Sequence, residues 1–320
     1  MSFHRESRRA SLLLLGLVIG CSDADAPMQE PPAAETPPPL PLARPPGFAM
    51  CYSSLAESHP ASQQFWQTFS AEDTKGRPAA IAALNKAVKQ YPDEEELVLL
   101  DGLANLWRLA APTDAEAKDS LGFMLAALAA KNQLEHAYTL CPTDYRVPAW
   151  LGPVLINMGR GSMDQPTLDK GMAVLQDGIA HYPSFVLFSQ LLIYADRPRD
   201  DPDFQKALDA VDKNTAVCAM PTQSIDPACT NSAKVLHNRE GSAVFLGDIY
   251  AKAGRRADAL NAYDRAKTVP EYATWPFQTL LQDRIANVDA RMKAYGDTDP
   301  KNDPDSAWTA RYQCAICHQR

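Results

Sequence analysis

One spacing of small, large and proline residues recurs four times along this chain of 320 residues. Its copies are Ala80, Leu84, Ala87, Pro92; Ala130, Leu134, Ala137, Pro142; Gly171, Leu175, Gly178, Pro183; and Ala259, Tyr263, Ala266, Pro270. Two small residues seven positions apart, on either side of the large one, allow a helix to lie close against its neighbour, and a proline ends the helix before the next one begins. No strand-type alternation competes with this pattern. The spacing therefore predicts an all-α fold between residues 76 and 292.

This spacing resembles the second helix of a tetratricopeptide repeat. Residues 240–270 resemble a complete unit, because Leu246, Gly247, Tyr250 and Gly254 stand at the offsets of the repeat's first helix. Trp150, Leu151, Gly152 and Gly159 echo the same offsets. The unequal separations of the copies imply insertions, and one divergent repeat is expected within residues 190–235.

The resemblance implies an all-α, tetratricopeptide-like α-solenoid of helical hairpins over residues 49–295, followed by a short C-terminal helix. Such a solenoid has a concave groove suited to peptides or to protein partners. A generic all-α domain is the alternative that the pattern leaves open.

The first twenty residues have the pattern of an export signal. Arg5, Arg8 and Arg9 precede an apolar run, Leu12 to Ile19, that is too short to cross a bilayer core of about 30 Å. Val18, Ile19, Gly20 and Cys21 then resemble the lipobox of bacterial lipoproteins, which implies that Cys21 is lipidated and becomes the mature N-terminus. By the same resemblance, Ser22 after the cysteine favours the outer membrane, with the protein facing the periplasm. An ordinary signal peptide with a chance cysteine is the alternative.

Residues 21–48 have the composition of a linker. Prolines, alanines and acidic residues dominate the segment, which cannot build a hydrophobic core. We expect a disordered, semi-rigid spacer between the lipid anchor and the folded domain.

The motif richest in chemistry lies in the C-terminal segment, residues 296–320. Cys314, Ala315, Ile316, Cys317 and His318 form CxxCH, the attachment motif of c-type haem. On a helix the two cysteines share one face and can reach the two vinyl groups of a porphyrin, while His318 is the proximal iron ligand. We therefore expect one covalent haem c. A plain disulfide, a redox dithiol or a zinc site are the alternatives.

A helix that carries this motif is expected to begin just upstream. Asp303 can cap it, Pro304 suits its first position, and Asp305 complements its dipole. Ala307 would then share an apolar face with Cys314 and Cys317.

The sixth iron ligand is not specified by the motif, because only Gln319 and Arg320 follow His318. Met292, on the last long helical segment, is the first candidate, with core packing as its alternative. The histidines at 59, 136, 181 and 237 are looser candidates.

The remaining cysteines are even in number. Setting aside Cys21, Cys314 and Cys317 leaves four residues, which we expect to form the disulfides Cys218–Cys229 and Cys51–Cys141. Parity alone does not choose between this arrangement and a third disulfide at Cys314 and Cys317.

Charge and motifs exclude several functional classes. The formal net charge of −8 argues against a nucleic-acid partner. No nucleophile elbow, phosphate-binding loop or HExxH motif is present, so the sequence favours an electron carrier or a binding scaffold over an enzyme. We expect a lipid-anchored monohaem cytochrome that docks a protein redox partner or a peptide in its groove. The alternative is a haem-free adaptor lipoprotein with a CxxC disulfide.

Overall fold

The computed structural model describes residue 51 and residues 54–113, 115–218, 237–297 and 303–308, without the side chains of residues 57, 214–218 and 238. Within these residues it contains thirteen α-helices, two short 3-10 helices and no strand. The predicted all-α class is therefore confirmed. No helix in this part of the chain is long and apolar enough to cross a membrane.

The helices follow one another with short connections. The α-helices are α2 (Ser54–Ser58), α3 (Pro60–Ser70), α4 (Arg77–Gln90), α5 (Glu95–Ala110), α6 (Ser120–Leu140), α7 (Val147–Ser162), α8 (Gln165–His181), α9 (Pro183–Tyr194), α10 (Pro202–Cys218), α12 (Asn238–Lys252), α13 (Arg256–Ala266), α14 (Gln278–Ala286) and α15 (Val288–Ala294). The 3-10 helices are η3 (Glu116–Lys118) and η6 (Pro270–Thr274).

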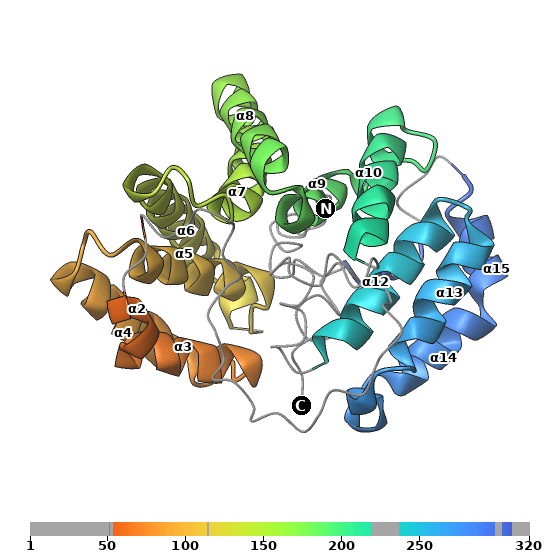
Figure 1. Ribbon diagram of the computed structural model, residues 1–320, viewed down its shortest axis with the longest axis horizontal. Helices are drawn as coiled ribbons and strands as arrows, with labels where there is room; N and C mark the ends of the chain where they lie inside the picture. Colours follow the sequence, from red (N-terminus) through yellow and green to blue (C-terminus); the bar gives the residue numbers. More distant parts are fainter. Residues whose placement is uncertain (1–50, 52–53, 114, 219–236, 298–302, 309–320) are drawn as a thin grey trace.

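Consecutive helices pair into hairpins. The pairs α3 with α4, α5 with α6, α7 with α8, α9 with α10, and α12 with α13 are in contact along their lengths. Figure 1 shows these hairpins arranged in chain order along an arc, from α2 at one end to α14 and α15 at the other. The hairpin of α12 and α13 coincides with the unit expected at residues 240–270. The hairpin of α9 and α10 overlaps the range 190–235 where a divergent repeat is expected, but it begins earlier, at Pro183.

The recurring small and large residues all lie on the buried faces of the second helices. Every alanine, leucine, glycine and tyrosine of the four copies is buried in α4, α6, α8 or α13. The prolines of the copies follow within four residues of each helix end. The prediction that this spacing marks close helix packing is confirmed.

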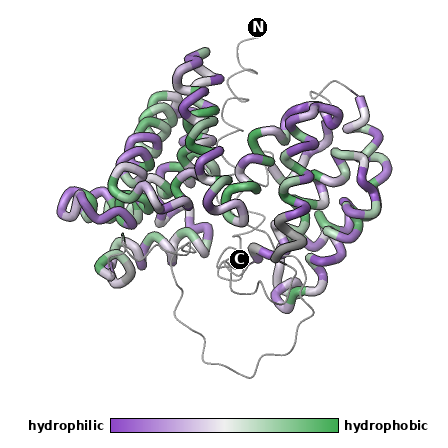
Figure 2. Tube along the Cα trace, turned by 45° about the horizontal axis from the view of Figure 1, so that its top comes forward, coloured by the Kyte–Doolittle hydropathy of each residue, from purple (hydrophilic) through white to green (hydrophobic). Residues whose placement is uncertain are grey.

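The first and second helices of the hairpins differ in burial. Nearly all described side chains of α5, α7, α9 and α12 are buried, whereas α4, α6, α8 and α13 bury one face. Figure 2 accordingly shows hydrophilic and hydrophobic segments alternating along the outer helices. The first helices therefore form the inner layer of the arc.

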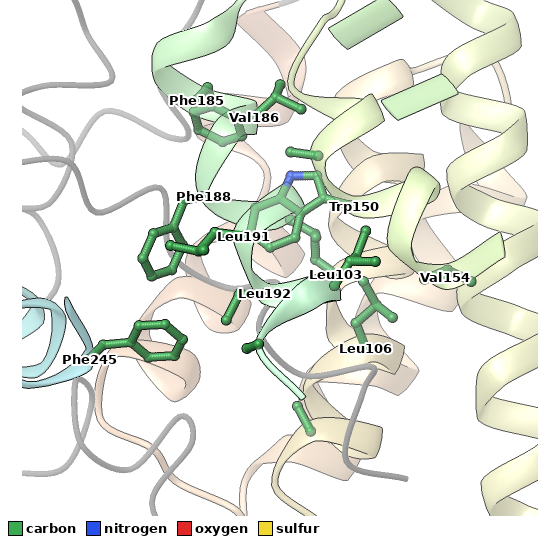
Figure 3. Packing of buried hydrophobic residues seen from close by; sticks show 14 of the residues in the cluster. Leu103, Leu106, Trp150, Val154, Phe185, Val186, Phe188, Leu191, Leu192 and Phe245 are labelled. Atoms are coloured by element: carbon green, nitrogen blue, oxygen red, sulfur yellow. The ribbon is translucent and has the colours of Figure 1, made fainter. Parts of the chain in front are cut away.

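One hydrophobic core joins these inner helices. The Trp150 ring of α7 lies edge-on to Phe185 of α9, with 6.1 Å between the ring centroids. Phe188 of α9 faces Phe245 of α12 at 4.9 Å, and Leu103 of α5 lies near Trp150 in Figure 3. The core thus continues without a break from α5 to α12.

Candidate haem-attachment site

The haem-attachment motif lies outside the described residues. This applies to Cys314, Cys317 and His318, and also to the expected lipidation site Cys21. Cys229 lies outside as well, and Cys218 ends α10 with its side chain undescribed, so the pairing Cys218–Cys229 stays a prediction. What the structure describes is the segment that leads to the motif and the helices that hold it.

This tail segment, residues 303–308, is bound by its backbone to the last helices of the arc. Arg284 of α14 and Arg291 of α15 each donate from Nη2 to the carbonyl oxygen of Asp305, at 2.7 and 2.8 Å. The backbone N–H of Ala307 donates to Asp248 Oδ2 of α12 at 2.8 Å. Three helices therefore share the binding of the backbone at Asp305 and Ala307. We call Asp248, Arg284 and Arg291 the tail clasp.

Further contacts hold both ends of the tail segment. Lys252 Nζ lies 3.1 Å from Asp303 Oδ2, and Tyr295 Oη donates to the carbonyl oxygen of Pro304 at 3.3 Å. The Trp308 ring lies 5.6 Å from Phe245, so the segment ends against the hydrophobic core of the inner layer.

The clasp is a buried ionic network centred on Asp248. This fully buried carboxylate accepts from Tyr263 Oη at 2.7 Å, and its Oδ1 lies 3.1 Å from both Arg284 Nε and Arg291 Nη2. Burial lowers the pKa of Arg291, but the carboxylate of Asp248 outweighs it, so the net shift is upward. Arg291 therefore stays charged, and both arginines donate to the tail carbonyl.

The helix expected to begin at Pro304 is a wrong prediction. Residues 303–306 have no regular secondary structure, and residues 307–308 form a turn. The physical reason is that the clasp and Tyr295 use the carbonyl oxygens of Pro304 and Asp305 and the N–H of Ala307. These backbone groups would otherwise form the first turn of a helix.

Sequence reasoning missed the clasp residues. Arg284 and Arg291 are seven positions apart, on one side of consecutive helical segments, and both are buried. Two buried arginines at helical spacing indicate that buried acceptors face them, but their sequence does not say which segment supplies the acceptors.

Met292, the candidate distal ligand, lies on α15 beside Arg291. Its side chain is half-buried and packs against the hydrophobic core. That position agrees with core packing and does not test iron ligation.

The candidate histidines have varied surroundings. His59 caps α3, since its Nδ1 accepts from the backbone N–H of Ala61 at 3.1 Å. His181 is exposed and stacks on Tyr145, with centroids 4.3 Å apart, and His136 is half-buried on α6. His237 is buried before α12, with Nδ1 2.9 Å from Glu240 Oε1.

The expected disulfide between Cys51 and Cys141 is present, with Cα atoms 5.8 Å apart. Cys141 directly follows α6. The bond therefore attaches the N-terminal end of the described chain to the connection between α6 and α7.

A second buried ionic cluster joins α5 to that same connection. Glu95, Glu96 and Asp144 offer carboxylate oxygens within 4.8 Å of one another, a set that can hold a metal ion. The Arg146 guanidinium lies among them, with Nε 2.8 Å from Asp144 Oδ1 and Nη2 2.8 Å from Glu96 Oε2. Burial, with the nearby carboxylates of Asp144 and Glu96, raises the pKa of Glu95 to about 10. One arginine and one proton thus neutralise much of the cluster's charge.

Comparisons with models of protein families, with curated proteins and with solved structures found no match. The functional argument therefore rests on the motifs of the sequence and on the geometry of the clasp.

Proposed function

We propose that this protein is a lipid-anchored, periplasmic monohaem c-type cytochrome that exchanges electrons with a protein partner. The observation that carries the proposal is the CxxCH motif at residues 314–318. Its two thiols and one imidazole are the donor set of a covalent c-type haem, which when bound supplies a one-electron iron couple. Cys314 and Cys317 would hold the porphyrin and His318 the iron.

The tail clasp supports this proposal. Electron transfer needs a cofactor held at a defined position, and a terminal motif on a free tail would not provide one. The clasp fixes the backbone at Asp305 and Ala307, and Trp308 lies against Phe245 only six residues before Cys314. The chain's own contribution is then to orient the cofactor relative to the helical body.

The Cys51–Cys141 disulfide supports an exported location. Disulfides persist mainly in oxidising compartments such as the bacterial periplasm. The same compartment is where a lipobox at Cys21 and a haem-attachment motif would both be used. A tetratricopeptide-like solenoid would then offer its groove to the redox partner or to a peptide.

A visible spectrum tests the proposal. The full chain is produced with its own signal in cells that express haem-maturation machinery, and we expect a Soret band and sharp reduced bands in the membrane fraction. Cys314→Ala with Cys317→Ala should abolish covalent haem, and His318→Ala should shift the reduced spectrum. The matched control is Cys51→Ser with Cys141→Ser, which should keep the haem. Absence of a Soret band in the folded chain would contradict the proposal.

A further inference from the structure

The N-terminal half of α6 carries an exposed apolar stripe. Leu121, Met124, Leu125 and Leu128 are 63, 59, 56 and 43% exposed. Their spacing places them on one side of the helix, opposite to the buried face formed by Ala126, Ala127 and Ala130. They are four of the five large apolar side chains that are exposed in the described part of the chain. Residues 120–130 contain no charged residue.

Two lysines without an ion-pair partner among the described residues lie on the outer helix α4. This helix contains Lys86 and Lys89 and no acidic residue, and its third cation, Arg77, is buried and paired with Glu116. A hollow of about 670 Å³ is lined by Lys86, Lys89 and Arg108, with Glu116 as its acidic residue. Neither lysine has an ion-pair partner among the described residues, whereas Arg108 pairs with Glu116 at 3.1 Å. This local excess of positive charge contrasts with the protein's net charge of −8.

The two features adjoin at the N-terminal end of α6. Asp101 of the inner helix α5 accepts from Asn85 of α4 at 2.9 Å and from Gln133 of α6 at 2.8 Å, so both outer helices meet α5 at this residue. Arg108 also lies 4.0 Å from Asp119, the N-cap of α6. The hollow therefore borders the end of α6 where the stripe begins.

The chain itself leads from this face to the expected lipid. Cys51 is bonded to Cys141, directly after α6. Residues 22–50 separate it from Cys21 and can span about 90 Å when extended, as their prolines favour. A helix that lies in the plane of a membrane keeps both of its ends near the surface, so the tether and the stripe can reach the bilayer together.

We propose that the α4–α6 face, with the apolar stripe of α6 and the lysines of α4, docks on the surface of an anionic lipid bilayer. This inference rests on the lipid anchor of the proposed function. Leucine and methionine side chains enter the boundary between headgroups and acyl chains, and Lys86 and Lys89 face the phosphates. A protein that is already tethered to the bilayer gains from a second contact that costs little further entropy.

Oxidation of Met124 by hydrogen peroxide tests the docking. The lipidated full chain is placed on vesicles of phosphatidylethanolamine and phosphatidylglycerol, and oxidation is read by peptide mass against half-buried Met172 as internal reference. We expect Met124 to be oxidised about fivefold more slowly than in a stripe variant, Leu121→Asn with Leu125→Asn and Leu128→Asn. The three residues are exposed, so the variant should keep the circular dichroism and melting temperature of the parent.

Two further variants sharpen the test. Lys86→Gln with Lys89→Gln should reduce the protection on anionic vesicles and leave it unchanged on phosphatidylcholine vesicles. The matched control is Met163→Asn, which alters an apolar side chain that is 92% exposed at the C-terminal end of α7. This variant should leave the protection of Met124 intact.

Three results would overturn the inference. Equal oxidation of Met124 in the parent and the stripe variant excludes docking, and equal protection on both vesicle types excludes anionic lipid as the partner. Protection that needs no vesicles and grows with protein concentration assigns the stripe to a second copy of the chain. The mass of the N-terminal peptide reports the lipid on Cys21, so failure of the anchor is distinguished from failure of the docking. The absorbance of the haem is read separately and tests the proposed cytochrome.

Discussion

At the scale of single residues, two buried ionic clusters are neutralised in different ways. In the tail clasp two arginines surround Asp248, and their remaining donors bind the backbone of the tail. In the other cluster Arg146 serves Asp144 and Glu96, while Glu95 retains a proton. The tail clasp therefore depends on the carboxylate of Asp248, whereas the second cluster depends on a neutral side chain at Glu95.

The first dependence predicts a large effect of Asp248→Asn. The change leaves two buried arginines without their shared carboxylate, which should cost about 3–5 kcal/mol of stability and release the tail segment to proteases. Melting curves and limited proteolysis measure both effects. The matched control is Asp289→Asn, whose exposed ion pair with Arg256 should matter little. An unchanged melting temperature and an intact tail in Asp248→Asn would contradict the assignment of the clasp.

The second dependence predicts a pH effect at Glu95. Burial raises the pKa of Glu95 from 4.5 to about 10 in the folded protein. Between pH 4.5 and about pH 10, the folded state therefore holds a proton that the unfolded chain has lost. The protonated Glu95 side chain contributes fully to the free energy of unfolding below pH 4.5. This contribution falls as pH rises, by at most about 1.4 kcal/mol per pH unit.

Glu95→Gln removes this dependence, since glutamine resembles the protonated acid. We expect the variant to match the parent near pH 4.5 and to exceed it in unfolding free energy at pH 8, as measured in urea. A parent that gains stability over Glu95→Gln as pH rises would show that Glu95 is ionised in the folded protein. Exposed Asp93→Asn serves as the control for general charge effects.

At the scale of helices, α7 and α8 pack closely against each other. A Cβ atom at Gly178 would lie 2.5 Å from Pro148 Cβ, and one at Gly171 would lie 2.7 Å from the backbone nitrogen of Ile156. These glycines occupy the small-residue positions of the recurring spacing. They allow the second helix of the hairpin to contact the backbone of the first.

A pair of glycine variants measures this contact. Gly178→Ala should destabilise the protein by about 1–3 kcal/mol, because the added methyl group overlaps Pro148. Gly161→Ala is the matched control near the end of α7, where nothing lies within 4 Å of the added Cβ, and it should stabilise by about 0.5–1 kcal/mol. Equal effects of the two changes on the unfolding free energy would contradict close packing of α7 against α8.

Helix positions were predictable because small residues and prolines act locally. Ala130, Leu134 and Ala137 mark the buried face of α6 through their spacing alone. The end of the described chain was not predictable in this way. Asp303 and Pro304 favour a helix start locally, but Arg284 and Arg291 of the preceding helices bind the carbonyl oxygen of Asp305.

At the scale of the whole molecule, the hairpins form one continuous arc, and its two ends carry different features. The α2–α6 end carries the disulfide to the N-terminal segment and the apolar stripe. The α12–α15 end holds the tail that leads to CxxCH. Under the two proposals, the first end attaches to the membrane, and the other end binds the backbone that leads to the haem-attachment motif.

The arc itself follows from the repeated spacing, whereas its relation to the cofactor does not. Cys314, Cys317 and His318 are recognised by their order in the sequence, and their partners on the helical body depend on long-range packing. Met292 shows the difficulty, because its half-buried place on α15 suits core packing and gives no evidence of iron ligation.

The mass of the C-terminal peptide decides whether this protein carries a covalent haem. The mature protein is isolated from membranes without reduction and digested, and the peptide that contains Cys314 to His318 is weighed. Covalent haem predicts a peptide about 600 Da heavier than its amino acids. A peptide that is lighter by two hydrogens than the dithiol form would show a disulfide, and the account of an electron carrier would be contradicted in favour of a haem-free docking protein.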